Sequence, residues 1–542
     1  MNSTQKNSKH IIFRKKKSRK ERYESIEPYM KSKNFPLYDY QKIGLDWLLT
    51  RELVGYKTEQ NTVYGGLLCD EPGLGKTIQI CAALYCNPLK YTLLVLPNSV
   101  IRQWIDTIKK ILPSESIYFY HGTNRCKTVA ELKLKKFKII VTTYGMLYSR
   151  KKDTEQSTIL HNFGCWDRIV FDEVHTLRNK KSLVAKSACR LKGNIRWGLT
   201  GTPIQNSEKD LYSLYKFLEI PKNYFNTKCA KVINKSLVLR RTKDEFKRFT
   251  TKFPKLNQIN HLLEFNTDKE RNIYRKLQQN LLEDYFKSAY NKSFSTDGSE
   301  HSGFVLIELL LRLRQLSLHP QILINSLNRK FDSNISKFTS NSTKISKLMD
   351  IIINTKDEYC LVFCHFKEEI KLIGNELKNK NIGFLIYDGS TKLQEREEII
   401  KMYPPKPLFN RIAYKNNLPK KILQNIQTYF PKVLLIQIKA GGVGLNLQQF
   451  SQLFILSPDW NPSNEIQAIA RSHRLGQHKT VNVHRFLLFD QGDELNKCKF
   501  STIDEHISSV QNDKRHIMAD ILEDDRYINT PVYNDLAGLK TQ

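Results

Sequence analysis

Two short stretches carry residue types suited to phosphate chemistry, and the first is the glycine-rich turn in "LLCDEPGLGKTIQ". Gly73 and Gly75 would let successive backbone N–H groups point at one centre, where the following helix N-terminus also attracts phosphate. Lys76 would reach the β- and γ-phosphates, and the Thr77 hydroxyl would hold Mg²⁺. The usual pattern G-x-x-x-x-G-K-[ST] has Gly where this chain has Asp70, so a plain glycine turn before a helix is the alternative.

The second stretch is the acidic pair in "RIVFDEVH", which follows an apolar run. Asp172 suits Mg²⁺ coordination, and Glu173 suits orienting the water that attacks a γ-phosphate. An exposed acidic turn is the alternative, but it fits poorly after a strand that reads as buried. The two stretches together predict nucleotide hydrolysis.

A third stretch, "NEIQAIARSHRLGQ", could complete such a site from another part of the chain. Gln467, Arg471, Arg474 and Gln477 are separated by four, three and three residues, which predicts one face of a helix. The face could be merely solvated. Opposite a nucleotide cleft its arginines would act as arginine fingers, which contribute about 10³–10⁵ in rate.

The elements that would position these residues form two alternating blocks. In each block, short apolar runs bounded by turn residues are followed by amphipathic stretches, which predicts a parallel sheet in α/β units. Such sheets bind ligands at the carboxyl ends of their strands. A Lys-rich, helical stretch separates the blocks, and the fold class predicted is α/β with two parallel-sheet lobes and helical insertions between them.

Charge is the main compositional signal. The chain has 87 Lys and Arg against 54 Asp and Glu, a formal net charge of +33, and most of the excess lies beyond residues 1–34. A basic body of this kind indicates a polyanionic partner, most often nucleic acid. The ten cysteines are scattered without any C-x-x-C, and no apolar run approaches a membrane span. We expect a soluble intracellular protein without a secretory signal.

These motifs, in this order, resemble the Swi/Snf-type (sucrose-non-fermenting) ATPases of helicase superfamily two over about residues 36–525. The turn resembles that family's Asp-Glu-Met-Gly-Leu-Gly-Lys-Thr, in which Asp stands first, with Pro72 here in place of Met. "GLTGTPIQN" resembles motif III, "KAGGVGLNL" resembles motif V, and "DEVH" places His175 as a coupling residue. The resemblance implies ATP and Mg²⁺ as cofactors, Thr77 and Asp172 as metal ligands, and two RecA-like lobes. It implies catalytic roles for Lys76, Asp172, Glu173, Arg471 and Arg474. Gln41 would read adenine. The other implied nucleotide contacts are Asp70, Gly73, Leu74, Gly75, Lys76, Thr77, Gly444 and Gln467.

The resemblance also implies translocation on double-stranded DNA, used to remodel DNA–protein complexes. Nucleosomes, other DNA-bound proteins or RNA polymerase would be further partners, in the nucleus or, for a viral protein, in a cytoplasmic virus factory or virion. For Trp460, lobe packing is an equal alternative to DNA contact. The candidate DNA contacts are Asn98, Arg102, Gln103, Thr142, Thr143 and Trp460.

"LVLRRTK" and "LLRLRQLSLHPQ" resemble most the post-replication-repair branch, but the short Cys-free connection that follows leaves no room for its RING insertion. "TIDEHISSVQNDKRHI" resembles the C-terminal brace of the family. A helicase-like nucleoside triphosphatase serving transcription, as in poxviruses, and a non-catalytic DNA-binding scaffold are the alternatives. The expected parts are a basic disordered tail or import signal (1–33), the first lobe or helicase ATP-binding domain (34–220), a helical insertion region (221–335), the second lobe or helicase C-terminal domain (336–490) with a Pro-rich insertion (403–432), and a C-terminal brace and tail (491–542).

Overall fold

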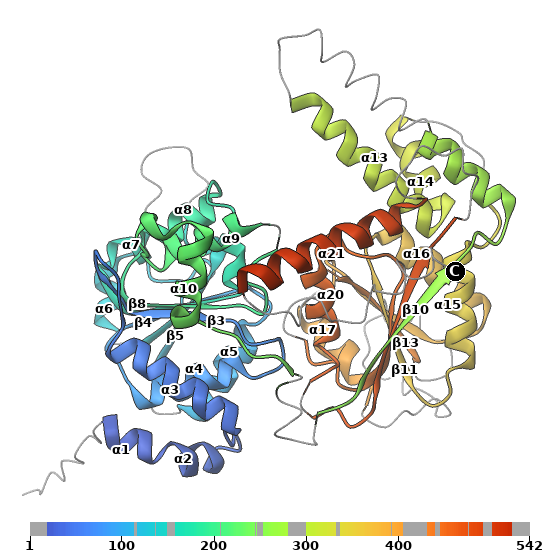
Figure 1. Cartoon of the computed structure of the whole chain (residues 1–542). Helices are drawn as coiled ribbons and strands as arrows, with labels where there is room; N and C mark the ends of the chain where they lie inside the picture. The colour runs from blue at the N-terminus through green and yellow to red at the C-terminus, as the bar shows by residue number, and fades with distance from the viewer. Residues whose placement is uncertain are drawn as a thin grey trace, which may run out of the picture.

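Two parallel sheets form the framework of the computed structural model (Figure 1). The first sheet has seven strands in the order β5-β6-β4-β7-β8-β3-β9, and the second has six in the order β10-β15-β14-β11-β13-β12. This confirms the predicted fold class of two parallel α/β lobes. The structure describes residues 19–112, 116–135, 137–148, 158–205, 207–243, 245, 253–279, 300–331, 337–391, 393–404, 431–438, 445–474, 476–490 and 501–522.

The first sheet is covered on both faces, which explains why its central strands read as continuous apolar runs. One face packs on the core that contains α3 (Asp39–Leu53), α4 (Lys76–Cys86) and α5 (Ile101–Ile111). The opposite face packs on α6 (Val129–Leu134), α7 (Ile159–Asn162), α8 (Leu183–Arg190), α9 (Glu208–Phe217) and α10 (Thr227–Leu237). The strands are β3 (Gly65–Leu68), β4 (Thr92–Leu96), β5 (Ile117–Phe119), β6 (Ile139–Thr143), β7 (Cys165–Asp172), β8 (Lys192–Leu199) and β9 (Val238–Leu239), beside a small antiparallel pair of β1 (Tyr56–Lys57) and β2 (Thr62–Val63).

The second sheet is built in the same way. Its strands are β10 (Leu256–Leu263), β11 (Tyr359–Cys364), β12 (Phe384–Tyr387), β13 (Val433–Gln437), β14 (Phe450–Ile455) and β15 (Val481–Leu488). The helices of this half are α13 (Glu300–Leu318), α14 (Pro320–Phe331), α15 (Thr343–Asn354), α16 (Lys367–Asn379), α17 (Leu393–Lys401) and α20 (Pro462–Ile469). Residues 405–430 of the expected Pro-rich insertion lie outside the described residues.

The segment 221–335, expected to be helical, also supplies one edge strand to each sheet. β9 pairs with β3 in the first sheet, and β10 pairs with β15 over eight residue pairs in the second. "LNQINHLL" of β10 mixes polar and apolar residues, and nearly all of them are half-buried because the strand lies at the sheet edge. Periodicity alone therefore gave no strand signal there.

The prediction of a disordered tail over residues 1–33 is wrong for its second half. Residues 19–32 form α1 (Arg19–Glu24) and α2 (Ile26–Ser32), which pack on the first lobe. Met30 is fully buried, and the Tyr29 ring stacks on Tyr85 of α4 with 3.9 Å between ring centroids. The cause is a short apolar stripe that the surrounding basic residues hide in the sequence. Residues 1–18 lie outside the described residues, so their role as an import signal stays a prediction.

The helix α21 (Ile503–Leu522) runs between the two lobes (Figure 1). Its first turns pack through Ile503 and Ile507 in a cluster that includes Leu488 of the second lobe. Its last turns place Met518 and Ile521 in the core of the first lobe. This helix therefore packs against the cores of both lobes, and its role as a brace stays a prediction.

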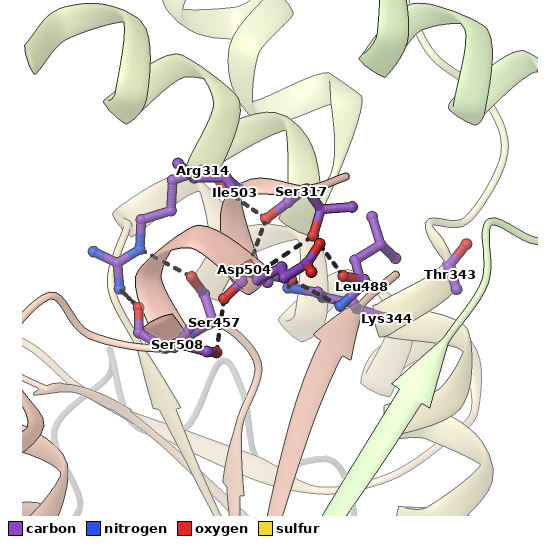
Figure 2. Close-up of polar contacts among 12 residues, drawn as sticks. Arg314, Ser317, Thr343, Lys344, Ser457, Leu488, Ile503, Asp504 and Ser508 are labelled. Carbon is purple, nitrogen blue, oxygen red and sulfur yellow. Dashed lines mark hydrogen bonds and ion pairs between the residues drawn. The ribbon is translucent and has the colours of Figure 1, made fainter. Parts of the chain in front are cut away.

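A buried ion pair anchors the first turn of α21 (Figure 2). Lys344 and Asp504 are both fully buried, and Lys344 Nζ lies 2.5 Å from Asp504 Oδ2. The same carboxylate accepts hydrogen bonds from the Leu488 backbone N–H at 2.9 Å and from Ser317 Oγ at 3.3 Å. Burial lowers the pKa of Lys344, and the charge of Asp504 opposes that shift. One carboxylate thus holds α21, α13, α15 and β15 at a single point.

In the part of the chain that the structure describes, no helix combines the length and the apolar character of a membrane span.

Candidate nucleotide site

The glycine-rich turn lies between β3 and α4 and has the backbone that a phosphate cradle requires. Gly73 and Gly75 adopt φ of +97° and +79°, which side chains with a Cβ rarely tolerate. A Cβ on Gly75 would lie 2.5 Å from Gln41 Nε2, and one on Gly73 would lie 3.3 Å from Arg474 Cβ. Close approach on both sides therefore requires glycine at these two positions.

The polar residues of the turn are held by the protein itself. Lys76 opens α4 and donates from Nζ to the Asp70 carbonyl at 2.6 Å, while Thr77 is half-buried as the second residue of that helix. Gln41 is buried, and its Nε2 donates to the carbonyl of the buried Leu74 at 3.1 Å. Gln41 thus lies against the cradle, and the reading of adenine stays a prediction.

The Asp70 side chain supports the turn from behind. It is fully buried and accepts hydrogen bonds from Arg241 Nε at 2.8 Å and from Gln79 Nε2 at 3.0 Å. Arg241 follows β9, 171 residues further along the chain. A buried carboxylate needs a compensating partner, but nothing local in the sequence indicated that Arg241 provides it. Asp70 therefore acts on the cradle through its carbonyl and its anchored side chain.

Asp172 and Glu173 lie at the carboxyl end of β7, as predicted. Burial raises the pKa of the Asp172 carboxyl, and the neighbouring charge of Glu173 raises it further. Burial alone would also raise the pKa of Glu173, but the hydrogen bond from His175 and the charges of His175, Lys76 and Arg471 lower it below its usual range. The pKa values of the two carboxyls are thus shifted in opposite directions, and Asp172 is the weaker acid of the pair.

His175 connects this pair to the stretch that resembles motif III. Its Nδ1 lies 3.3 Å from Glu173 Oε2 and 3.0 Å from Thr200 Oγ1. Thr200 Oγ1 also accepts from the Thr202 backbone N–H at 3.1 Å. The role of His175 as a coupling residue stays a prediction.

The arginines reach the site, but they do so from a loop. The prediction that Gln467, Arg471, Arg474 and Gln477 share one helical face is wrong, because α20 ends at Ile469. The Leu447 backbone N–H donates to the Arg471 carbonyl at 3.1 Å. Gln477 instead donates to the backbone carbonyls of Gln448 and Phe450. Only the half-buried Gln467 remains on the helix.

Arg471 and Arg474 nevertheless face the first lobe. Burial lowers the pKa of Arg471, whereas the charges of Glu173 and Asp172 raise it. The Arg474 Cβ lies 3.3 Å from where a Cβ of Gly73 would be. The structure thus brings the cradle, the acidic pair and both arginines to one place between the lobes.

A second bridge between the lobes was missed from the sequence. Lys243 Nζ donates to the His473 carbonyl at 2.9 Å, and the Lys243 backbone N–H donates to Glu71 Oε2 at 3.0 Å. His473 Nε2 lies 2.9 Å from the Pro254 carbonyl. Lys243 therefore links the turn directly to the arginine loop, although "LVLRRTK" carried no assigned role.

The candidate DNA contacts divide into exposed and buried groups. Asn98, Arg102 and Gln103 are exposed around the start of α5. Thr142 and Thr143 are 0% and 3% exposed, and the Thr142 hydroxyl donates to the Tyr120 carbonyl at 2.9 Å. The structure therefore offers no exposed side chain at these two threonines.

Two further predicted positions can be placed only in part. Trp460 is half-buried and contacts His506 of α21 edge-on, with 5.8 Å between ring centroids. Packing thus occupies one side of this ring. Gly444, with the rest of "KAGGVG", lies outside the described residues.

Comparison with protein families agrees with this arrangement. Residues 40–322 match the SNF2-related domain, and residues 343–476 match the helicase conserved C-terminal domain. The chain belongs to the SNF2-related family. It is accordingly an enzyme of the ATP-dependent helicase type.

Curated relatives are similar over most of this chain. A probable global transactivator of Orgyia pseudotsugata multicapsid polyhedrosis virus is 26% identical and covers 84% of this chain and 87% of its own. Transcription termination factor 2 of Drosophila melanogaster is 26% identical over 93% of this chain, and DNA repair protein RAD5B of Arabidopsis thaliana is 25% identical over 87%. This chain spans 58% and 46% of those two cellular relatives.

A solved structure is also similar in sequence. The Sulfolobus solfataricus SWI2/SNF2 ATPase core in complex with dsDNA is 25% identical, covering 84% of this chain and 88% of its own. The TM-score is 0.37, so the superposition adds nothing to the family assignment.

Proposed function

We propose that the chain is an ATP-driven motor that translocates on double-stranded DNA and remodels DNA–protein complexes. The observation that carries the proposal is the approach of the arginine loop of the second lobe to the first: the Arg474 Cβ lies 3.3 Å from where a Cβ of Gly73 would be, and the charges of Glu173 and Asp172 act on Arg471. A site completed by both lobes is sensitive to their closure, because a guanidinium placed there stabilises charge that develops during phosphoryl transfer. Hydrolysis can then alternate with opening and closing of the cleft.

The residues present fit ATP with Mg²⁺. The positive φ of Gly73 and Gly75 gives the turn the backbone that a phosphate cradle requires, and the oxygen donors of Thr77 and Asp172 are of the kind Mg²⁺ prefers. When bound, Mg²⁺ would neutralise charge on the phosphate oxygens. Lys76 would exchange its bond to the Asp70 carbonyl for a phosphate oxygen, and Glu173 would orient the attacking water.

Charge and exposure support DNA as the track. Most of the +33 excess lies beyond residues 1–34, and α5 exposes Arg102 and Gln103 beside Asn98. Such a surface neutralises backbone phosphates without reading sequence. The absence of a RING insertion in the sequence keeps ubiquitin-ligase activity out of the proposal, although the motifs resemble the post-replication-repair branch.

Phosphate release measured with defined duplex, single-stranded DNA and RNA tests the proposal. We expect the duplex to stimulate ATP turnover most. We also expect ATP-dependent displacement of a third strand from a triplex, with little separation of a forked duplex. Efficient strand separation would place the protein among conventional helicases, and turnover that ignores duplex DNA would refute the proposal.

Transcription-coupled work is a second candidate, supported by the names of two relatives, a probable global transactivator and a transcription termination factor. In that case RNA polymerase would be the partner. Retention of RNA polymerase on the immobilised protein, with stimulation of turnover by RNA in place of duplex DNA, would favour this candidate.

A further inference from the structure

Asp172 is held by two aromatic side chains that come from different segments of the first lobe. Trp104, on α5, is 1% exposed and donates its indole N–H to Asp172 Oδ2 at 2.8 Å. Tyr144, in the short 3-10 helix after β6, donates its hydroxyl to the Asp172 carbonyl at 2.5 Å. One donor thus fixes the carboxylate and the other fixes the backbone that carries it.

Both aromatic residues are adjacent to a surface that could meet a ligand. Trp104 directly follows Arg102 and Gln103, which are exposed on the first turn of α5. Tyr144 directly precedes Gly145, which is exposed in the same short 3-10 helix. A shift of either segment would move the donor, because each ring sits one or two residues from that surface and is packed in the core.

We propose that Trp104 and Tyr144 are positioning residues that transmit DNA binding on the first lobe to Asp172. The inference deepens the proposed function and rests on it. DNA held at the start of α5 would fix that helix, and the two donors would then hold Asp172 in the orientation that suits a metal-bound nucleotide. Residues that orient a metal ligand in this way typically change metal affinity or activity by about 10–100-fold when they are replaced.

Two buried aromatic residues of the same lobe provide matched controls. Trp166 is fully buried near the start of the same strand as Asp172, and it donates to the Leu160 carbonyl at 3.1 Å. Tyr215 is fully buried on α9, and it donates to Asn234 Oδ1 at 2.8 Å. Trp166→Phe and Tyr215→Phe therefore remove the same kinds of donor and leave similar gaps, but they do so away from the acidic pair.

The test compares Trp104→Phe and Tyr144→Phe with these controls in the full-length chain. Three quantities are measured: the Kd for duplex DNA without nucleotide, ATP turnover with and without saturating duplex, and the Mg²⁺ concentration that gives half-maximal turnover. For Trp104→Phe we expect the ratio of stimulated to unstimulated turnover to fall at least about five-fold and the half-saturating Mg²⁺ to rise about ten-fold. The Kd should stay within about two-fold, and Tyr144→Phe should show the same changes more weakly.

The outcomes separate the inference from the function on which it rests. The inference alone would be overturned if duplex DNA stimulates the parental protein but both variants keep the parental ratio of stimulated to unstimulated turnover and the parental half-saturating Mg²⁺ concentration. A parental protein that duplex DNA does not stimulate would overturn the proposed function and the inference with it. Equal losses in the controls would also overturn the inference, because they would show a general effect of loosening the core. If Trp104→Phe does not fold, Tyr144→Phe, which loses a single hydroxyl, decides the question.

Discussion

Removing the Lys344 charge should loosen the brace by a predictable amount. Lys344→Met keeps the length of the side chain but leaves Asp504 as a buried charge whose carboxylate, among the described residues, retains the neutral donors Leu488 N–H and Ser317 Oγ. Breaking a fully buried pair in this way costs about 3–5 kcal/mol. For a unit the size of one lobe, that lowers the midpoint of thermal unfolding by about 6–20 °C.

Differential scanning calorimetry measures this shift of the unfolding midpoint. A double substitution tests whether the shift comes from the unpaired charge of Asp504. Lys344→Met combined with Asp504→Asn removes both charges and keeps an acceptor for the Leu488 N–H, so it should regain at least half of the loss. Lys347→Met, on the same helix α15 and only half-buried, is the control and should move the midpoint little. Equal midpoints for the two lysine variants would show that the pair does not anchor α21.

Three further expectations follow from the described contacts. Deleting residues 1–18 should weaken the affinity for duplex DNA and reduce its dependence on salt without abolishing binding. A deletion that extends through residues 19–32 should also lower the unfolding temperature, because those helices pack on α4. Binding isotherms at several salt concentrations and a thermal scan of each protein check both expectations. Burial lowers the pKa of His484 to about 4, so the stability that the neutral His484 contributes is present above pH 6.5 and is lost as the pH falls towards 4, at roughly 1.4 kcal/mol per pH unit. His484→Gln should therefore make the denaturant midpoint less dependent on pH between 4 and 6.5. An unchanged pH dependence would contradict the lowered pKa of His484. Arg241→Ala should leave Asp70 buried without its cation and weaken ATP binding at least about ten-fold, measured by fluorescence, while binding at the parental level would show that the anchor is dispensable.

Local patterns were sufficient to predict the two sheets and the residues at their strand ends. The turn with Gly73 and Gly75 and the acidic pair at Asp172 are each contained within a few residues, and their chemistry follows from that order. What the sequence could not show were partners far away along the chain. Arg241 meets Asp70 across 171 positions, and Trp104 meets Asp172 across 68. Only the folded structure shows which of many similar side chains forms a hydrogen bond with each of these two carboxylates.

The errors also have physical causes. The helical spacing of the arginines continued past Ile469, but tertiary contacts to the Arg471 carbonyl and the Gln477 amide hold that segment as a loop. The helices at residues 19–32 were hidden because a short apolar stripe stands among many lysines and arginines. In both places, packing against another part of the chain overrode the local pattern.

Replacing Arg471 distinguishes a nucleotide site shared by both lobes from one contained in the first lobe. Arg471→Ala should leave ATP binding largely intact but reduce turnover about 10³-fold or more, because a finger from the other lobe mainly meets charge that develops during transfer. Lys76→Ala should lose binding as well, since Lys76 opens the helix of the cradle itself. Arg190→Ala, exposed at the end of α8, is the control. Nucleotide binding and steady-state hydrolysis are measured for each variant. Near-parental hydrolysis by Arg471→Ala would contradict a site shared by the two lobes.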